Sequence, residues 1–351
     1  MLTLMGFTMR WRLACSICFA ATLFGGPPET RSPAFDDDLF KRDAQVISVH
    51  GEFLFWRVQE GALDYALKMR SAAWGPSTSY AQGKFEKATY NGDPGFRIAT
   101  SFFRAPKYWE IWAVYTRLTA RGQNSASKPE PTDQFITGTW PQVTTAPLSG
   151  ATSRIHLNYN VADLLIDRWF SPNPHLRLRM LGGAGVAWIN QDWKIHYNDA
   201  AGRVTKVRNR WSYTGGGFRM GTSIDWYWQS DFYVTASATT AVLMGTYRNR
   251  AEQTTDYQPT AADNTSVPIR KADFRDARPV FSVQAYLGPS WQKNFPKNRV
   301  EVFVGYEMNV WFNLQEVYRS TGGGPSDAKE TWINTGLLTL QGLTTRVTVD
   351  F

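Results

Sequence analysis

Cysteine and histidine are scarce in this 351-residue sequence. The only cysteines, Cys15 and Cys18, lie in a short apolar segment near the beginning, so the rest of the chain can form neither a disulfide framework nor a thiolate metal site. None of the four histidines lies at metal-ligand spacing from another: His50, His156, His175 and His196. Nucleophile-elbow and phosphate-loop motifs are missing as well. We therefore expect no metal, no cofactor and no enzymatic activity.

Long apolar runs and clustered charge are also missing. Beyond residue 26 no stretch approaches the roughly 18 consecutive apolar residues of a membrane helix. Charged residues make up 19% of the chain, and the net charge of +8 is dispersed rather than gathered beside a recognisable nucleic-acid-binding module. Aromatic residues, by contrast, reach 15%, with 15 Trp and 15 Tyr. This composition predicts no nucleic-acid partner and is typical of the aromatic girdles of a transmembrane β-barrel.

The beginning of the chain has the features of a secretory signal peptide. Arg10 and Arg12 precede the apolar segment Leu13–Phe24, and small residues follow. This segment is too short to span a bilayer, which favours cleavage over anchoring. We predict a signal peptide over residues 1–26, a flexible periplasmic tail over 27–45 and a single outer-membrane barrel domain over 46–351.

The last ten residues alternate strictly between two faces. Leu343, Val347, Val349 and Phe351 share one face, and the residues between them are mostly polar. This period of two predicts a β-strand. A final strand with a terminal aromatic residue is typical of outer-membrane β-barrels, in which it pairs with the first strand. The edge strand of a soluble sandwich is the alternative.

Similar alternating runs fill the chain, and short and long connections alternate between them. The sequence thus predicts an all-β fold, an antiparallel up-and-down transmembrane β-barrel of about ten strands. A further hairpin over Gly61–Met69 and Phe85–Tyr90 would make about twelve. The predicted strands are Val46–Val58, Gly95–Phe103, Tyr108–Ala120, Arg154–Phe170, Leu176–Trp193, Trp211–Trp228, Phe232–Gly245, Val280–Trp291, Val300–Phe312 and Gly342–Phe351.

One of these runs changes phase. Ile155, Leu157, Tyr159 and Val161 share a face, whereas Leu164 and Ile166 are the next apolar positions. One extra residue near Ala162 and Asp163 would restore the alternation, which we interpret as a β-bulge. The alternative is that one flank of the run is assigned to the wrong face.

Alternation also predicts which charged side chains face the lumen. Charges of both signs occur there in similar amount, and they either line a pore or pair with one another in a packed interior. Trp112, Tyr286 and Trp311 point inward too. The predicted pore-lining residues are Glu52, Arg97, Glu110, Asp163, Asp167, Arg177, Arg179, Arg219, Asp225, Arg299, Glu301, Glu307 and Arg346.

The alternation of lipid-facing and lumen-facing positions also predicts what substitutions cost in stability. Met308 should face lipid and Glu307 the lumen. Because lumen charges are expected to be hydrated, a substitution of Glu307 should cost less than one of Met308.

A basic segment falls in a predicted extracellular loop. Its residues Arg203, Lys206, Arg208 and Arg210 would suit the phosphates of lipopolysaccharide. A solvated loop kept soluble by its charge is the alternative. A hydrolase with Ser and His at the lipid interface, as in some outer-membrane barrels, would need a neighbouring Ser–His pair, and the sequence indicates none.

Several short motifs occur in an order that resembles the Legionella-type major outer membrane protein family, over roughly Val46 to Phe351. They are Gly51–Trp56, Asp64–Leu67, Asp93–Arg97, Tyr115–Arg117, Asn158–Leu164, Gly305–Leu314 and Gly336–Leu343. The family is described as pore-forming and also occurs in chlamydia-like bacteria. The resemblance implies a porin-like protein in the outer membrane of a Gram-negative-type bacterium.

The expected function is passive diffusion of small hydrophilic solutes or ions, with selectivity set by lumen size and charge. The alternative is a closed barrel with a structural or adhesin-like role through its long extracellular loops. Expected partners are outer-membrane lipid, lipopolysaccharide and the barrel assembly machinery, the last by resemblance to other outer-membrane barrels. A homo-oligomer is compatible with the sequence.

Overall fold

The structure is a computed structural model, and it describes residues 45–69, 83–104, 108–130, 134–140, 146–173, 175–228, 231–256, 267–295, 297–320, 330–334 and 336–351. The predicted signal peptide and nearly all of the predicted periplasmic tail lie outside these residues. No helix within the described residues is long and apolar enough to cross a membrane.

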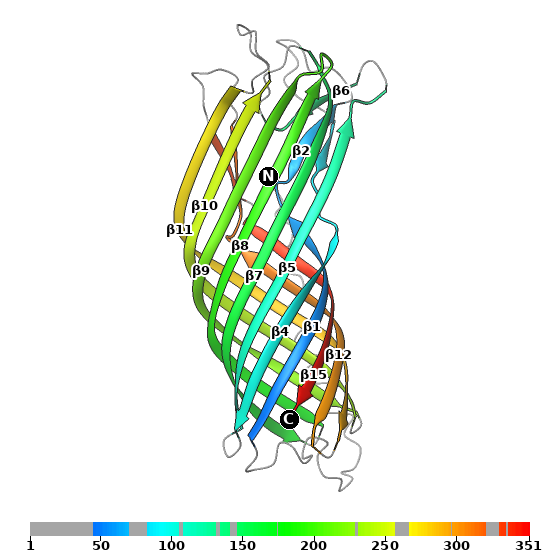
Figure 1. Cartoon of the computed structure of the whole chain (residues 1–351), viewed down its shortest axis with the longest axis vertical. Helices are drawn as coiled ribbons and strands as arrows, with labels where there is room; N and C mark the ends of the chain where they lie inside the picture. The colour runs from blue at the N-terminus through cyan, green and yellow to red at the C-terminus, as the bar shows by residue number, and fades with distance from the viewer. Residues whose placement is uncertain are drawn as a thin grey trace, which may run out of the picture.

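Ten antiparallel strands form a closed ring in the order β1, β15, β12, β11, β10, β9, β8, β7, β5, β4 (Figure 1). The all-β barrel and its strand number are therefore confirmed. The strands are β1 (Gln45–Glu60), β4 (Gly92–Arg104), β5 (Trp109–Ser127), β7 (Leu148–Asn173), β8 (Leu176–Asp199), β9 (Val204–Tyr227), β10 (Phe232–Thr255), β11 (Val267–Asn294), β12 (Arg299–Phe312) and β15 (Leu337–Asp350).

The further hairpin that would have made twelve strands does not join the ring but forms a separate sheet. β2 (Asp64–Met69) and β3 (Gly83–Lys87) pair with each other, and β2 also pairs with β6 (Phe135–Gly138). Figure 1 shows β2 and β6 in the upper part of the view, toward the end opposite the C-terminus. β13 (Glu316–Ser320) and β14 (Glu330–Asn334) form a separate two-stranded sheet.

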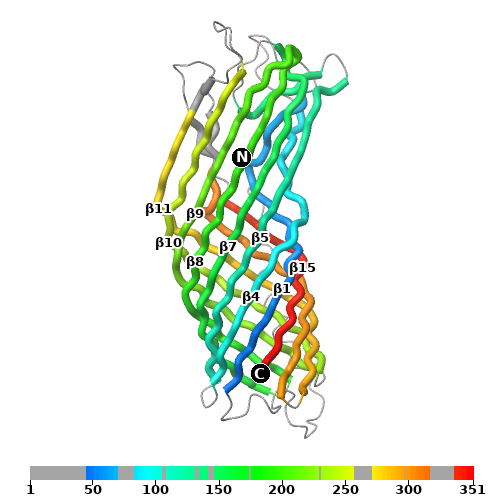
Figure 2. Tube along the Cα trace, in the orientation of Figure 1, coloured from blue at the N-terminus to red at the C-terminus, as the bar shows by residue number. Residues whose placement is uncertain are grey.

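The last strand closes the barrel against the first. β15 pairs antiparallel with β1, and the amide of Ile47 donates to the carbonyl of Phe351 at 3.1 Å while that of Phe351 donates to Ile47 at 2.9 Å. Closure matters because an unpaired strand edge in hydrocarbon leaves backbone groups unsatisfied at several kcal/mol each. In the tube of Figure 2 the first and last strands lie side by side.

The stagger of the ring sets the width of the lumen. From Val49 the ladder leads around nine neighbours to Leu337, whereas β1 pairs Val49 directly with Val349, so the register advances by 12 residues. With strands about 4.8 Å apart and a rise of about 3.3 Å per residue, this gives a tilt of about 40° and a backbone radius of about 10 Å. Long side chains from opposite walls can therefore meet.

The closure can be tested by a crosslink. His50 lies opposite Thr348, and both side chains are buried in the lumen. Because Ile47 and Phe351 form a hydrogen-bonded pair in this register, His50 and Thr348 form a non-hydrogen-bonded pair. Facing residues at such positions have Cα atoms about 4.5 Å apart, which suits a disulfide. We expect His50→Cys with Thr348→Cys to crosslink in the folded protein. His50→Cys with Val347→Cys, whose side chains point to opposite faces, should not, and the reverse pattern would show a different register.

The predicted β-bulge near Ala162 and Asp163 is wrong. The register of β7 runs without a shift through both residues against β5 and against β8. Instead, Val161 is buried in the lumen whereas Leu164 is 57% exposed on the outside. Apolar side chains change face here because the strand leaves the membrane: below, they face lipid, and above, they fill the lumen.

β8 changes face at the same level. Val186 is exposed on the outer wall, whereas Ile189 is buried inside. Strands β7 to β10 have 24 to 26 residues, far more than the roughly ten needed to cross a bilayer. They continue beyond the apolar band on the side of the longer connections, which in such barrels faces outward.

Candidate functional site

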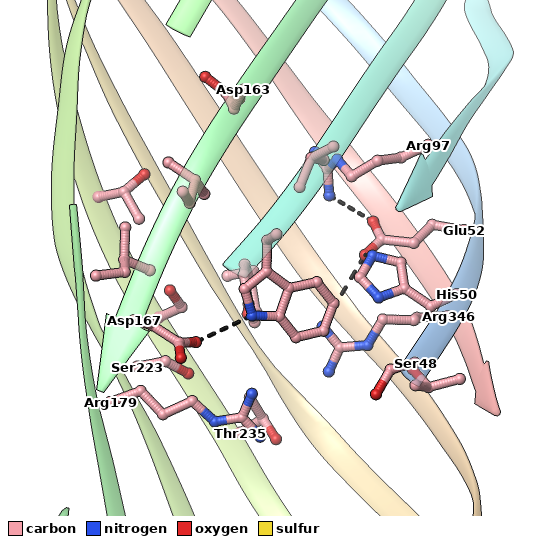
Figure 3. Close-up of a pocket in the computed structure, with 18 of the residues that line it drawn as sticks. Ser48, His50, Glu52, Arg97, Asp163, Asp167, Arg179, Ser223, Thr235 and Arg346 are labelled. Carbon is pink, nitrogen blue, oxygen red and sulfur yellow. Dashed lines mark hydrogen bonds and ion pairs between the residues drawn. The ribbon is translucent and has the colours of Figure 1, made fainter. Parts of the chain in front are cut away.

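The lumen holds every charged side chain that alternation assigned to it. All are buried or partly buried and face inward, and most line one cavity of about 160 Å³. Figure 3 shows several of them, with Asp163, Asp167 and Arg179 on one side of the lumen and Arg97, Glu52 and Arg346 on the other. They are Glu52, Arg97, Glu110, Asp163, Asp167, Arg177, Arg179, Arg219, Asp225, Arg299, Glu301, Glu307 and Arg346.

Glu307 belongs to a network of buried ion pairs in the lumen. Its side chain is 0% exposed and accepts hydrogen bonds from Arg97 Nη2 at 2.7 Å and Thr344 Oγ1 at 2.8 Å. Arg97 also pairs with Glu52 and donates to Thr116 Oγ1 at 2.9 Å. These residues join β1, β4, β5, β12 and β15, and the side chains of the three charged residues are at most 9% exposed.

These ion pairs continue toward the end with the short turns, since Arg346 Nη1 lies 3.9 Å from Glu52 Oε1. Arg299 Nε donates to Asp350 Oδ2 at 2.6 Å, and Arg346 Nη2 to Glu301 Oε1 at 3.0 Å. On the other wall Arg219 Nε donates to Asp163 Oδ1 at 3.0 Å. Opposite charges therefore neutralise one another locally.

Aromatic rings hold the remaining arginines. The guanidinium of Arg177 lies 4.6 Å and that of Arg179 4.4 Å from the ring centre of Trp169, and both face Asp225 at 3.9 and 3.5 Å. Trp112 Nε1 donates to Asp167 at 3.1 Å (Figure 3). Such stacked, paired arginines are positioned more firmly than exposed ones.

At the edge of the cavity, which Tyr159 and Asn309 help to line, two walls of the barrel touch. Asn309 Nδ2 of β12 donates to the hydroxyl of Tyr159 on β7 at 3.0 Å, and the ring of Tyr159 packs edge-on against Trp311 at 5.9 Å. In the ring order β7 and β12 lie opposite each other. This contact therefore spans the lumen.

Above that contact the lumen is an apolar core. Fully buried side chains from nearly every strand pack there, among them Leu54, Trp56, Leu118, Leu157, Ile189, Trp193, Tyr213, Leu243, Val280, Trp311 and Leu340. The sheet of β3, β2 and β6 packs against this core, since the hydroxyl of Tyr197 on β8 donates to the carbonyl of Tyr65 on β2 at 2.7 Å. Sequence reasoning missed this core because it assigned one face of each strand to lipid over its whole length.

The histidines are scattered. His50 lies in the lumen 3.7 Å from Glu52, His175 is in a turn, and His156 and His196 are on the outer wall. No group of three or more His, Cys, Asp or Glu residues within the described part of the chain could hold a metal ion.

The basic residues predicted in a loop lie elsewhere. Lys206, Arg208 and Arg210 belong to β9, and their side chains alternate outward with buried Val207 and Asn209; only Arg203 is in the turn. The prediction of a loop was wrong because above the membrane the outer face of a strand is polar, so the run lacks a lipid-facing pattern.

One buried carboxyl lies outside the membrane band without a cation. Glu60 Oε2 accepts from the Tyr90 hydroxyl at 3.0 Å and from Gln191. Burial raises the pKa of Glu60 to about 8, although both hydrogen bonds lower it. Because the folded-state pKa lies above the unfolded value of 4.5, the contribution of Glu60 to stability is fully present below pH 4.5 and is lost as the pH rises toward 8.

We therefore expect Glu60→Gln to flatten this pH dependence. The parent should lose up to about 1.4 kcal/mol per pH unit from this group between pH 5 and 8. Chemical unfolding in lipid vesicles at both pH values measures it. Identical slopes in the two proteins would show that Glu60 is ionised in the folded barrel.

The outer wall carries a band of exposed apolar and aromatic side chains, and the last strand closes the ring against the first. These features define an outer-membrane β-barrel. The chain belongs to the family described as Legionella pneumophila major outer membrane protein precursor, whose model matches residues 43–351. The protein is thus an outer-membrane protein.

Several solved barrels are similar in structure. The outer membrane protease OmpT from Escherichia coli is 11% identical, with 87% of this chain and 96% of that chain covered and a TM-score of 0.39. A Pseudomonas aeruginosa FadL homologue is 8% identical, with 91% and 93% covered and a TM-score of 0.27. The P. putida toluene transporter TodX is 9% identical, with 91% of each chain covered and a TM-score of 0.27. No curated protein matches the sequence.

Proposed function

We propose that this protein is a closed outer-membrane barrel without a permanently open pore. It acts at the cell surface through the part of β7 to β10 that continues beyond the apolar band. The observation that carries the proposal is the hydrogen bond between Tyr159 and Asn309, which joins opposite walls. The apolar core above it supports the same conclusion, because a solute would have to displace Trp56 and Trp311, both 0% exposed. We assign it no catalytic role.

The ion pairs below support a closed lumen as well. A radius of about 10 Å lets long side chains from neighbouring and opposite strands meet, as in other small barrels. Leaving one charge of a buried pair without its partner costs about 3–5 kcal/mol. A path through the lower lumen would require several such movements, since Arg97, Glu307 and Glu301 all lie in it.

Passive diffusion of small hydrophilic solutes or ions is the second candidate. It is favoured by the cavity of about 160 Å³, which charges of both signs line at membrane level. On this candidate, the layer of Tyr159, Asn309 and Trp311 is a gate that must open. This candidate corresponds to the porin-like function that the family resemblance implies.

Solute release from vesicles separates the two candidates. Vesicles containing folded parent protein should retain an entrapped sugar as long as lipid-only vesicles do. Tyr159→Ala combined with Trp311→Ala, checked for folding by circular dichroism, should release it faster. Release by the parent itself would overturn the closed barrel and support the pore.

A further inference from the structure

We propose that a groove on the outer wall of β7 to β10 binds the phosphorylated headgroup of the outer-leaflet glycolipid, lipopolysaccharide. The groove is lined by Arg210, Arg248 and Arg250 together with polar side chains of β7 and β8. This inference goes beyond the proposed function and holds whether or not the lumen conducts.

The groove lies at the depth of lipid headgroups. On the outer wall the apolar residues Leu164, Val186 and Met244 are exposed to lipid. Above them Tyr115 and Trp188 pack against each other at 6.5 Å, as aromatic residues do at a membrane interface. Asn190, which lines the groove, follows Trp188 on the same face of β8, about 7 Å further along the strand.

Pairing of the strands brings the cations of the groove together. Arg210 lies opposite Arg250 across β9 and β10, and Ser212 lies opposite Arg248. Asn158 and Asn190 face each other across β7 and β8. The groove has a volume of about 300 Å³. Guanidinium groups beside amides and a hydroxyl suit a phosphate, which accepts several charge-assisted hydrogen bonds.

The carboxylates around the groove do not fully neutralise its arginines. Asp192 is held by Arg208 at 3.0 and 2.6 Å, and one carboxylate, Asp273, serves both Arg248 and Arg250. Among the described residues, the ion pair of Arg210 is with Glu252, at 3.9 Å. A bound phosphate would supply the negative charge that the neighbouring carboxylates do not fully provide to these arginines.

Two buried nitrogens of the groove also lack a hydrogen-bond partner. Nε2 of His156 and Nε of Arg250 are buried and make no hydrogen bond within the described part of the chain. A buried polar atom without a partner is costly, so a ligand oxygen there is favourable. The charge continues in the next row outward, where Lys194 lies opposite Arg208.

Lipid binding by the purified protein tests this assignment. Thermal unfolding of the parent in nanodiscs is followed during titration with lipid A that carries both phosphates, with enzymatically dephosphorylated lipid A, and with inorganic phosphate. We expect the phosphorylated lipid to bind at least about tenfold more tightly than the dephosphorylated one, as one or two charged hydrogen bonds predict. Inorganic phosphate at the same concentrations should cause no shift.

Variants locate the site. Arg210→Gln with Arg248→Gln should abolish the preference for phosphorylated lipid, whereas Arg203→Gln, in the distant turn after β8, should retain it. If the double variant fails to fold, Arg210→Gln alone should reduce the preference. Equal binding of both lipids, an unchanged preference in the groove variants, or an equal shift with inorganic phosphate would overturn the proposal.

Discussion

Replacing Glu307 by Gln should destabilise the folded barrel by about 3–5 kcal/mol, because it removes one charge of a buried, hydrogen-bonded pair. The Glu307 side chain is fully buried and is bonded to Arg97 and Thr344. The substitution keeps the size of the side chain, so the loss reports on charge. Urea unfolding in lipid vesicles measures it.

Glu252→Gln is a matched control for this prediction. Glu252 lies on the outer wall, partly exposed, and its nearest cation is Arg210 at 3.9 Å. Such surface pairs contribute about 0–1 kcal/mol. If Glu307→Gln cost no more than Glu252→Gln, the lumen would be hydrated and the account of a packed interior would be wrong.

Met308→Arg should cost about 2–4 kcal/mol, the cost of a cation at the bilayer midplane on the lipid face of a barrel. Met308 is exposed on the outer wall, midway between Val304 and Phe312, which are exposed as well. An arginine there has neither water nor an acidic partner on the neighbouring strands, where Ala285 and Gln341 lie opposite it. Equilibrium unfolding in vesicles measures this cost too.

Depth provides the control for Met308. Phe312→Arg, at the edge of the apolar band, should cost less in charge burial, since the penalty falls to about 0–1 kcal/mol near the interface. Equal penalties at the two positions would place the membrane elsewhere along β12.

The order of these two effects differs from what the sequence predicts. Alternation correctly places Glu307 inside and Met308 outside. It does not show whether the inside is wet. That depends on Arg97, Gln284 and Thr344 reaching Glu307 from other strands, which requires the stagger of the whole ring.

The lower half of the barrel was predictable because one physical rule governs it. Each strand faces lipid on one side, so apolar residues recur at every second position, as Val304, Met308 and Val347 do on the outer wall. The same rule makes the closing strand recognisable. Backbone pairing then follows, since hydrocarbon tolerates no open edge.

The upper half was not predictable in this way. There the apolar face points inward, and Leu157 and Tyr159 pack in the lumen although they continue the strand that carries lipid-facing Leu164. The contact that closes the lumen joins Tyr159 and Asn309, which are 150 residues apart in the sequence. No local pattern shows that such residues will meet.

The central claim is that side chains close the lumen, and single-channel recording tests it most directly. The refolded parent protein, inserted in a planar bilayer in concentrated salt, should show no defined open level. Tyr159→Ala with Trp311→Ala should show discrete steps under the same conditions. Uniform, long-lived conductance steps from the parent, with an ion selectivity that Glu307→Gln alters, would contradict the closed barrel.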